Sequence, residues 1–180
     1  TIGLMALLVQ HGCFIPAAEG SRIDRFDPII AVIGDQQTVE GDLSSFSAHI
    51  VALKALLESA RPGTLALLDE LASGTDPAQG AALAQSVLET LLDQDARLVV
   101  TTHYARLKGL AAADPRFAVA ATQYREGLPT YRLVSGATGE SRAFELASRM
   151  GLDPCLLERA QQLMSDGEVQ LSRALTALER

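Results

Sequence analysis

The stretch LALLDELASGTDP, residues 65–77, joins a short apolar run to two adjacent acids and a turn of small residues. A short continuous apolar run of this kind is typical of a buried strand in a parallel sheet. Ligands of such sheets bind outside the carboxyl ends of the strands, which is where Asp69 and Glu70 fall. A carboxylate there can hold Mg²⁺, and a second one can orient or deprotonate an attacking water. Taken alone the pattern is a weak signal, because acids often begin loops.

The chain around this stretch alternates between short apolar runs and longer segments with helical spacing. We expect strands over 28–33, 64–68 and 96–102, and helices over 1–11, 44–60, 78–92 and 103–113. A strand, a helix and a strand in succession predict parallel strands joined by right-handed crossovers. The apolar residues of the first helix occupy several faces, so we expect that helix to be buried. The pattern favours an α/β fold.

The last third of the chain shows different patterns. Alternating residues over 117–135, around Glu126-Gly127-Leu128-Pro129, predict a β-hairpin. Two helices are expected over 141–150 and 154–164, joined by Gly151. An apolar stripe of Leu171, Leu175 and Leu178 either opens a coiled coil or packs on the core as a single amphipathic helix.

The composition limits the function. The chain has 180 residues, enough for one domain with a core, and 48% of them are hydrophobic. A net charge of −7 argues against a nucleic-acid-binding surface within these residues. Cys13 and Cys155 have no metal-like spacing, and we expect two buried free thiols in a reducing cytoplasm. No apolar run approaches the roughly 18 residues of a membrane span. The first residue is Thr1 and both ends lie in helical patterns, so we expect a fragment of a longer protein.

Three further groups could accompany the acids. His103 ends the next predicted strand, where it can reach a terminal phosphate, although a lone His is more often an ordinary surface or core residue. Ser44 and Ser45 open a predicted helix, either as a helix cap or as part of an anion-binding helix terminus. Gln36 and Gln37 follow a strand, where a glutamine could contact Mg²⁺ or water.

These segments together resemble the ATPase domain of the MutS family, which is of the ABC class. DLSSFSAHI (42–50) resembles the signature segment, LALLDELASGTDP the Walker B motif and the loop after it, and VVTTHYARLKGL (99–110) the switch-histidine segment. The resemblance keeps this order over about residues 1–165. GTDPAQGAALA (74–84) and SRAFELASRMGLDPCLLERAQQLM (141–164) are closer to the bacterial paralogue branch. Members of that branch usually carry a C-terminal small MutS-related (Smr) nuclease domain.

The resemblance implies a fold, a site and partners. The fold would be an incomplete three-layer P-loop NTPase-like parallel sheet core, with a β-hairpin and C-terminal helices. The implied limits are 1–137 for a truncated ATPase domain, 138–166 for a helical pair and 167–180 for the start of a helical linker. The longer protein would be a cytoplasmic homodimer without membrane contact. It would hydrolyse ATP with Mg²⁺ and handle DNA in anti-recombination, or collided ribosomes and their rRNA, through other domains. The implied site residues are Asp69 for the metal, Glu70 and His103 for catalysis, and Ser44, Ser45, Asp76, Gln36 and Gln37 for the nucleotide.

One expected motif is missing from these residues. The family's P-loop, G-x-x-x-x-G-K-[ST], cradles the phosphates with its backbone amides and its Lys. The chain has two lysines, Lys54 and Lys108, and each follows a Leu, so no Gly-Lys pair exists. In the family that loop directly precedes the helix that residues 1–11 resemble. We therefore expect these 180 residues alone not to bind ATP normally.

Two other interpretations stay open. The first is another ABC-class ATPase, of the chromosome-maintenance or transporter kind, although DLSSFSAHI has no Gly-Gly-Gln. The second is a dimerisation module that kept the fold and lost turnover.

Overall fold

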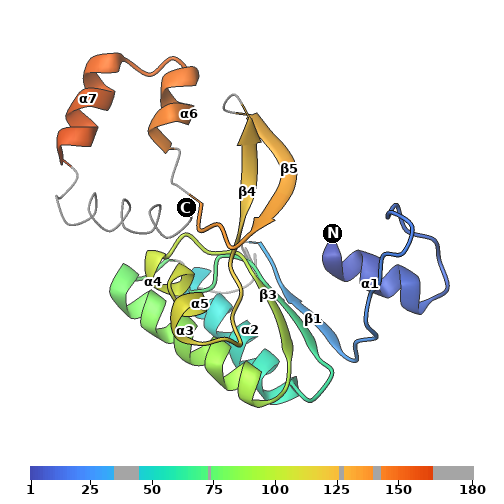
Figure 1. Ribbon diagram of the computed structural model, residues 1–180. Coiled ribbons are helices and arrows are strands. Elements are labelled where there is room, and N and C mark those ends of the chain that lie inside the picture. The colour runs from blue at the N-terminus through green and yellow to red at the C-terminus, as the bar shows by residue number, and fades with distance from the viewer. Residues whose placement is uncertain (35–44, 73, 126–127, 140–142, 164–180) are drawn as a thin grey trace. The chain divides into compact units, whose positions relative to one another are not determined.

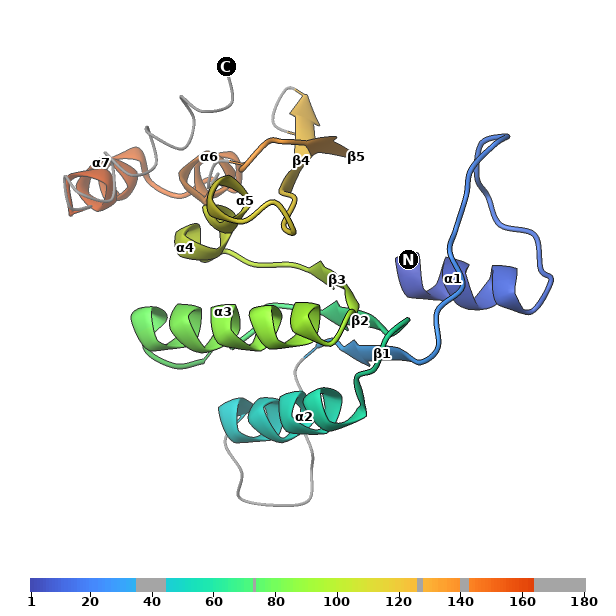
Figure 2. The same ribbon diagram turned by 60° about the horizontal axis from the view of Figure 1, so that its bottom comes forward.

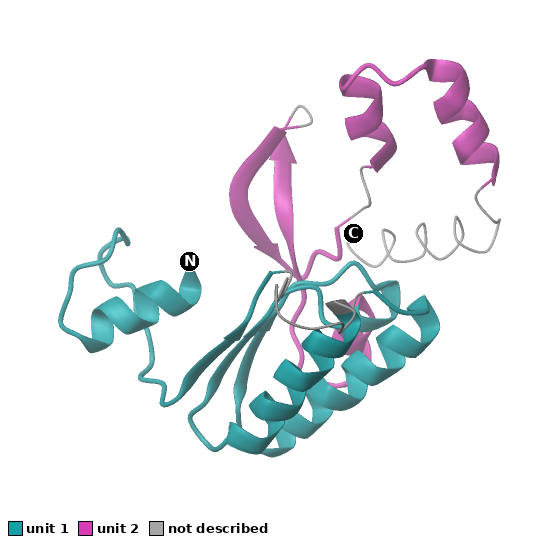
Figure 3. Ribbon diagram, turned by 180° about the vertical axis from the view of Figure 1, so that it is seen from behind, with its two compact units in different colours: residues 1–107 teal, residues 108–180 magenta. Residues whose placement is uncertain are grey.

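A computed structural model describes residues 1–34, 45–72, 74–125, 128–139 and 143–163 (Figure 1). The chain divides into two compact units, Thr1–Leu107 and Lys108–Arg180, shown in different colours in Figure 3. Among the described residues, no helix is long and apolar enough to cross a membrane. The predicted limits of the ATPase domain, helical pair and linker stay predictions.

The first unit is built on a three-stranded parallel sheet. Its strands are β1 (Ile29–Val32), β2 (Leu65–Leu68) and β3 (Arg97–Val100), in the order β1-β2-β3. The register pairs Val32 with Leu68 and Leu68 with Val100, so the three carboxyl ends lie at one edge. The predicted parallel strands are confirmed, and each is shorter than the range predicted for it.

Two helices cover one face of this sheet, as Figure 2 shows. They are α2 (Ser45–Ser59) and α3 (Pro77–Asp93); α2 contacts β1, α3 contacts β3, and the two helices contact each other. Pro77 is the first residue of α3, and Asp76 caps the helix by accepting the Gln79 N–H at 2.9 Å. The core of the unit is aliphatic and includes Val32, Leu53, Leu56, Ala66, Leu68, Ala84, Leu88 and Leu91.

Helix α1 (Ile2–Gln10) packs through a narrow stripe, so the prediction of a buried helix is wrong. Gly3 and Ala6 are buried, and a Cβ on Gly3 would collide with Cδ1 of Leu67 on β2. Since neighbouring side chains of a strand point to opposite faces, this contact is on the other face from Ala66 and Leu68. Four large apolar side chains of α1 are exposed: Ile2, Leu4, Leu7 and Val9.

The prediction of buried cysteines is also wrong, because Cys13 and Cys155 are both exposed. Cys13 follows the turn that closes α1, where its N–H donates to the Leu8 carbonyl at 2.8 Å. Cys155 is the second residue of α7 (Pro154–Leu163), and the buried position in that helix is Leu157. The expectation followed from the usual burial of free thiols, but neither position faces a core.

The second unit contains a hairpin and short helices. The hairpin pairs β4 (Ala120–Arg125) antiparallel with β5 (Leu128–Ser135), with a register shift between Thr122 and Tyr124. The helix predicted over 103–113 is two one-turn helices, α4 (Ala105–Lys108), which spans the end of the first unit, and α5 (Leu110–Ala113), in the second. The predicted helix pair is confirmed as α6 (Ala143–Arg149) and α7. The stripe of Leu171, Leu175 and Leu178 lies outside the described residues.

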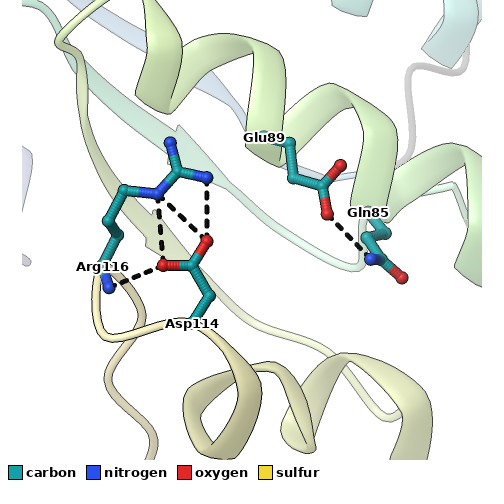
Figure 4. A network of polar contacts seen from close by, with 4 residues as sticks. All are labelled: Gln85, Glu89, Asp114 and Arg116. Atoms are coloured by element: carbon teal, nitrogen blue, oxygen red, sulfur yellow. Dashed lines mark hydrogen bonds and ion pairs between the residues drawn. The ribbon is translucent and has the colours of Figure 1, made fainter.

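Local polar pairs support both units (Figure 4). On α3, the Gln85 amide donates to Glu89 at 2.8 Å. In the second unit, the Arg116 guanidinium donates to both carboxylate oxygens of Asp114, and the Arg116 backbone N–H donates to Oδ1. The side-chain hydrogen bond from Arg116 lowers the pKa of Asp114, and the backbone bond adds to this effect.

Candidate functional site

The acidic pair lies at the carboxyl edge of the parallel sheet. The hydrogen-bond ladder continues past the strands, because the Asp69 N–H donates to the Val32 carbonyl at 3.0 Å. On the other side, the Thr101 N–H donates to the Leu68 carbonyl at 2.9 Å. Extending the pairing of Leu68 with Val100 by one residue sets Asp69 opposite Thr101. This edge is the usual ligand position of such sheets.

The Thr101 hydroxyl bonds to the side chain of Asp69 and to the backbone of Glu70. It donates to Oδ1 of Asp69 and accepts the backbone N–H of Glu70 at 3.2 Å. A hydroxyl has one proton and two lone pairs, so it can make both bonds together. One side chain, one residue beyond β3, therefore orients the Asp69 carboxylate and holds the backbone of Glu70. Thr101 was not among the site residues predicted from the sequence, although the predicted strand register could have indicated it.

The backbone turns sharply after Asp69. Glu70 has a φ of 46° and Ala72 a φ of 58°, both in the left-handed region. Leu71 and Ala72 are fully buried, whereas Glu70 is exposed. The turn therefore buries two apolar residues under the edge and leaves the Glu70 carboxylate in solvent, where an attacking water could reach it.

His103 lies two residues beyond Thr101 and is exposed. Its ring packs against Tyr104, with centroids 4.7 Å apart and ring planes at 45°. The Tyr104 N–H donates to the Thr102 hydroxyl at 3.0 Å. The chain thus turns away from β3 at this point and places His103 at the same edge of the sheet as the acids.

The remaining predicted residues lie at helix starts or outside the described part of the chain. Asp76 is the N-cap of α3, and its carboxylate accepts the Gln79 N–H. Its nucleotide-binding role stays a prediction. Ser45 is the first residue of α2. Ser44, Gln36 and Gln37 lie outside the described residues. The structure therefore brings together Asp69, Glu70 and Thr101, with His103 close by in sequence.

The oxygen atoms at this edge suit Mg²⁺. In the part of the chain that the structure describes, no group of three or more His, Cys, Asp or Glu side chains could hold a metal ion. Mg²⁺ does not need such a group, since it keeps several waters and binds one or two carboxylates plus substrate phosphates. The Asp69 carboxylate, with the Thr101 hydroxyl beside it, fits that requirement.

This fold and edge define an α/β protein whose acidic residues follow the central strand of a parallel sheet. The sequence model of the MutS domain V family matches residues 1–168. The chain belongs to this family.

Three curated relatives of the chain carry the printed name Endonuclease MutS2. The protein of Thermomicrobium roseum is 44% identical over 182 residues, which cover 100% of this chain and 23% of the relative. That of Pelotomaculum thermopropionicum is 43% identical, with coverages of 100% and 23%. That of Lactobacillus acidophilus is 41% identical over 177 residues, with coverages of 97% and 22%. The chain therefore spans about a quarter of the length of these relatives.

Proposed function

We propose that the chain is part of the ATPase domain of a longer MutS-like protein, called the parent protein below. The domain would have the three-layer P-loop NTPase core of the ABC class and hydrolyse Mg-ATP at a dimer interface. The observation that carries this proposal is the Thr101 hydroxyl, which orients Asp69 and holds Glu70 at the carboxyl edge of the sheet. Membership of the MutS domain V family supports it.

Each residue of the edge has a role in this proposal. Asp69, kept in one orientation by Thr101, holds Mg²⁺, which when bound neutralises charge on the phosphate oxygens. Glu70 projects from the turn into solvent and accepts a proton from the attacking water or orients it. His103 donates to the terminal phosphate from the end of the neighbouring strand. Ser44 and Ser45 contact the nucleotide of the other subunit, and Asp76, Gln36 and Gln37 complete the nucleotide site.

We also propose further roles for the parent protein. The relatives are named as endonucleases, which supports a nuclease activity outside these residues. The net charge of −7 argues against a nucleic-acid surface within these residues, so we assign DNA or ribosome contacts to other parts of the parent protein. Anti-recombination and the handling of collided ribosomes rest on the family resemblance alone, as does a cytoplasmic location.

The test is the variant Glu70→Gln in the parent protein. Gln keeps the shape of the side chain but is a far weaker base, so we expect ATP binding to be retained and kcat to fall by about 100-fold or more. Glu58→Gln is the matched control, because Glu58 lies on the exposed side of α2 beside Lys54. Unchanged kcat in Glu70→Gln would refute the proposed role. A parent protein that binds Mg-ATP without any turnover would favour the dimerisation module instead.

A further inference from the structure

Both backbone polar groups of Ala72 are bound by side chains from other elements. The Ala72 N–H donates to Nε2 of His49, on α2, at 3.3 Å. The Ala72 carbonyl accepts the Tyr104 hydroxyl, from beyond the end of β3, at 3.0 Å in a buried bond. We call His49, Ala72 and Tyr104 the Ala72 clamp. It joins α2 and the end of β3 to the turn that carries Glu70.

The clamp holds backbone in an unfavourable conformation. Glu70 and Ala72 both have a positive φ. Residues with a Cβ avoid this region, because the Cβ then lies too close to the following carbonyl oxygen. Such a conformation persists only where the surroundings enforce it. Ala72 is also fully buried, so its N–H and carbonyl would be unsatisfied without protein partners. The two bonds of the clamp therefore satisfy the N–H and the carbonyl of Ala72 and hold the turn in this conformation.

Helix α3 packs against the clamp at Gly80. A Cβ at this position would lie 2.7 Å from the Tyr104 hydroxyl oxygen and 2.9 Å from the Ala72 carbonyl oxygen. Glycine is thus the residue that leaves room for the bond between them. Because these groups are packed this closely, a shift of α3 or Tyr104 must move the turn as well.

The His49 bond requires a neutral ring. To accept a hydrogen bond at Nε2, the ring must carry its proton at Nδ1. Burial lowers the pKa of His49, which favours this neutral form.

His49 lies close to the start of α2. Helix α2 begins at Ser45, and His49 lies one helical turn further along. At the other end of the bond, Ala72 lies two residues after Glu70. The clamp therefore connects the start of α2 to Glu70 through one hydrogen bond and the short backbone segment from Glu70 to Ala72.

We propose that His49 and Tyr104 are positioning residues, which set the orientation of Glu70 by holding Ala72 and make it depend on the position of α2. The inference rests on the proposed function, in which the start of α2 contacts the nucleotide of the partner subunit. Under it, nucleotide held by one subunit favours the hydrolytic geometry of the other. Neither side chain takes part in the reaction itself.

The test compares variants of the parent protein by steady-state ATP hydrolysis. His49→Leu removes the acceptor, whereas His49→Gln retains an oxygen near the position of Nε2. Tyr104→Phe removes only the hydroxyl that binds Ala72. His11→Leu is the matched control, since His11 directly follows α1 and its ring binds the Leu7 carbonyl of that helix.

We expect kcat to fall about tenfold in His49→Leu and in Tyr104→Phe, in line with the loss of one buried hydrogen bond. KM for ATP should change less than about twofold, because the clamp orients Glu70 and does not hold the nucleotide. His49→Gln should recover kcat to within about threefold of the unchanged protein, and His11→Leu should keep it. Combining Ser45→Ala with His49→Leu should lower kcat no further than the more severe single change, since both act through one connection.

Two results would overturn the inference. One is an unchanged kcat in Tyr104→Phe, which tests the clamp even if His49→Leu does not fold. The other is a kcat as low in a folded His49→Gln as in His49→Leu. If Glu70→Gln also leaves kcat unchanged, the proposed function fails; if Glu70→Gln abolishes turnover while the clamp variants do not lower kcat, the clamp alone fails.

Discussion

Replacing Thr101 by Val is the most direct test of how the edge of the sheet works. Val keeps the branched shape of Thr but has no hydroxyl, so the packing changes little. The variant loses the bond to the Asp69 carboxylate and the bond from the Glu70 N–H together. Asp69 is then free to rotate, and the backbone of Glu70 loses its support from the neighbouring strand.

The size of the effect follows from these two bonds. A hydrogen bond to a charged group contributes about 1.5–3 kcal/mol and a neutral one about 0.5–1.5 kcal/mol. Thr101 is exposed, and water can replace part of each bond, so the low end of both ranges applies. A loss of about 2 kcal/mol in transition-state stabilisation corresponds to roughly a 30-fold lower kcat/KM.

The assay is ATP hydrolysis by the parent protein over a series of Mg²⁺ concentrations. We expect Thr101→Val to lower kcat/KM and to raise the Mg²⁺ concentration needed for half-maximal rate, because Asp69 is no longer pre-oriented. Thr101→Ser keeps the hydroxyl and should stay within a few fold of the unchanged protein.

The control is Thr90→Val, the same change at a hydroxyl that binds the Ser86 carbonyl within α3. Equal Mg²⁺ requirements and equal rates in Thr101→Val and Thr90→Val would refute the argument. They would show that Asp69 and Glu70 keep their places without Thr101.

Two further predictions concern stability and can be measured on the 180-residue chain by urea unfolding. Gly80→Ala should lower the free energy of unfolding by about 1–3 kcal/mol, because the new methyl group would lie against the Tyr104 hydroxyl and the Ala72 carbonyl; a gain of about 1 kcal/mol, as helix propensity alone predicts, would contradict the close packing. Burial lowers the pKa of His49 below its ordinary value of 6.5, so the unfolded chain takes up its proton first as the pH falls. The His49 contribution should therefore be complete above pH 6.5 and be lost as the pH falls through the folded-state pKa, and this slope should be absent from His49→Gln.

Much of the first unit could be predicted from the sequence. Three segments predicted as strands contain the strands Ile29–Val32, Leu65–Leu68 and Arg97–Val100. The segments between them that have helical spacing form helices. Parallel pairing followed from this order, since a crossover helix leads back to the same edge. The placement of Asp69 and Glu70 at the carboxyl edge followed in turn.

Burial was harder to predict than secondary structure. Cys13, Cys155 and the apolar residues of α1 were expected inside, and the structure exposes both thiols and four large side chains of the helix. Hydrophobic residues favour burial, but whether a surface covers them depends on which elements pack there. Periodicity shows that a segment is helical and cannot show how much of the helix is covered.

The sequence by itself determined the strand order along the chain, the acidic pair after the central strand and the family to which the motifs point. These features depend on neighbouring residues, and local spacing is enough to reveal them. Only the tertiary structure decided that Thr101 binds the Asp69 carboxylate and the Glu70 N–H, and that His49 and Tyr104 hold Ala72. Each of these contacts joins residues 23 to 32 positions apart, and a hydrogen bond forms only when the register of the sheet and the packing of α2 bring donor and acceptor within about 3 Å.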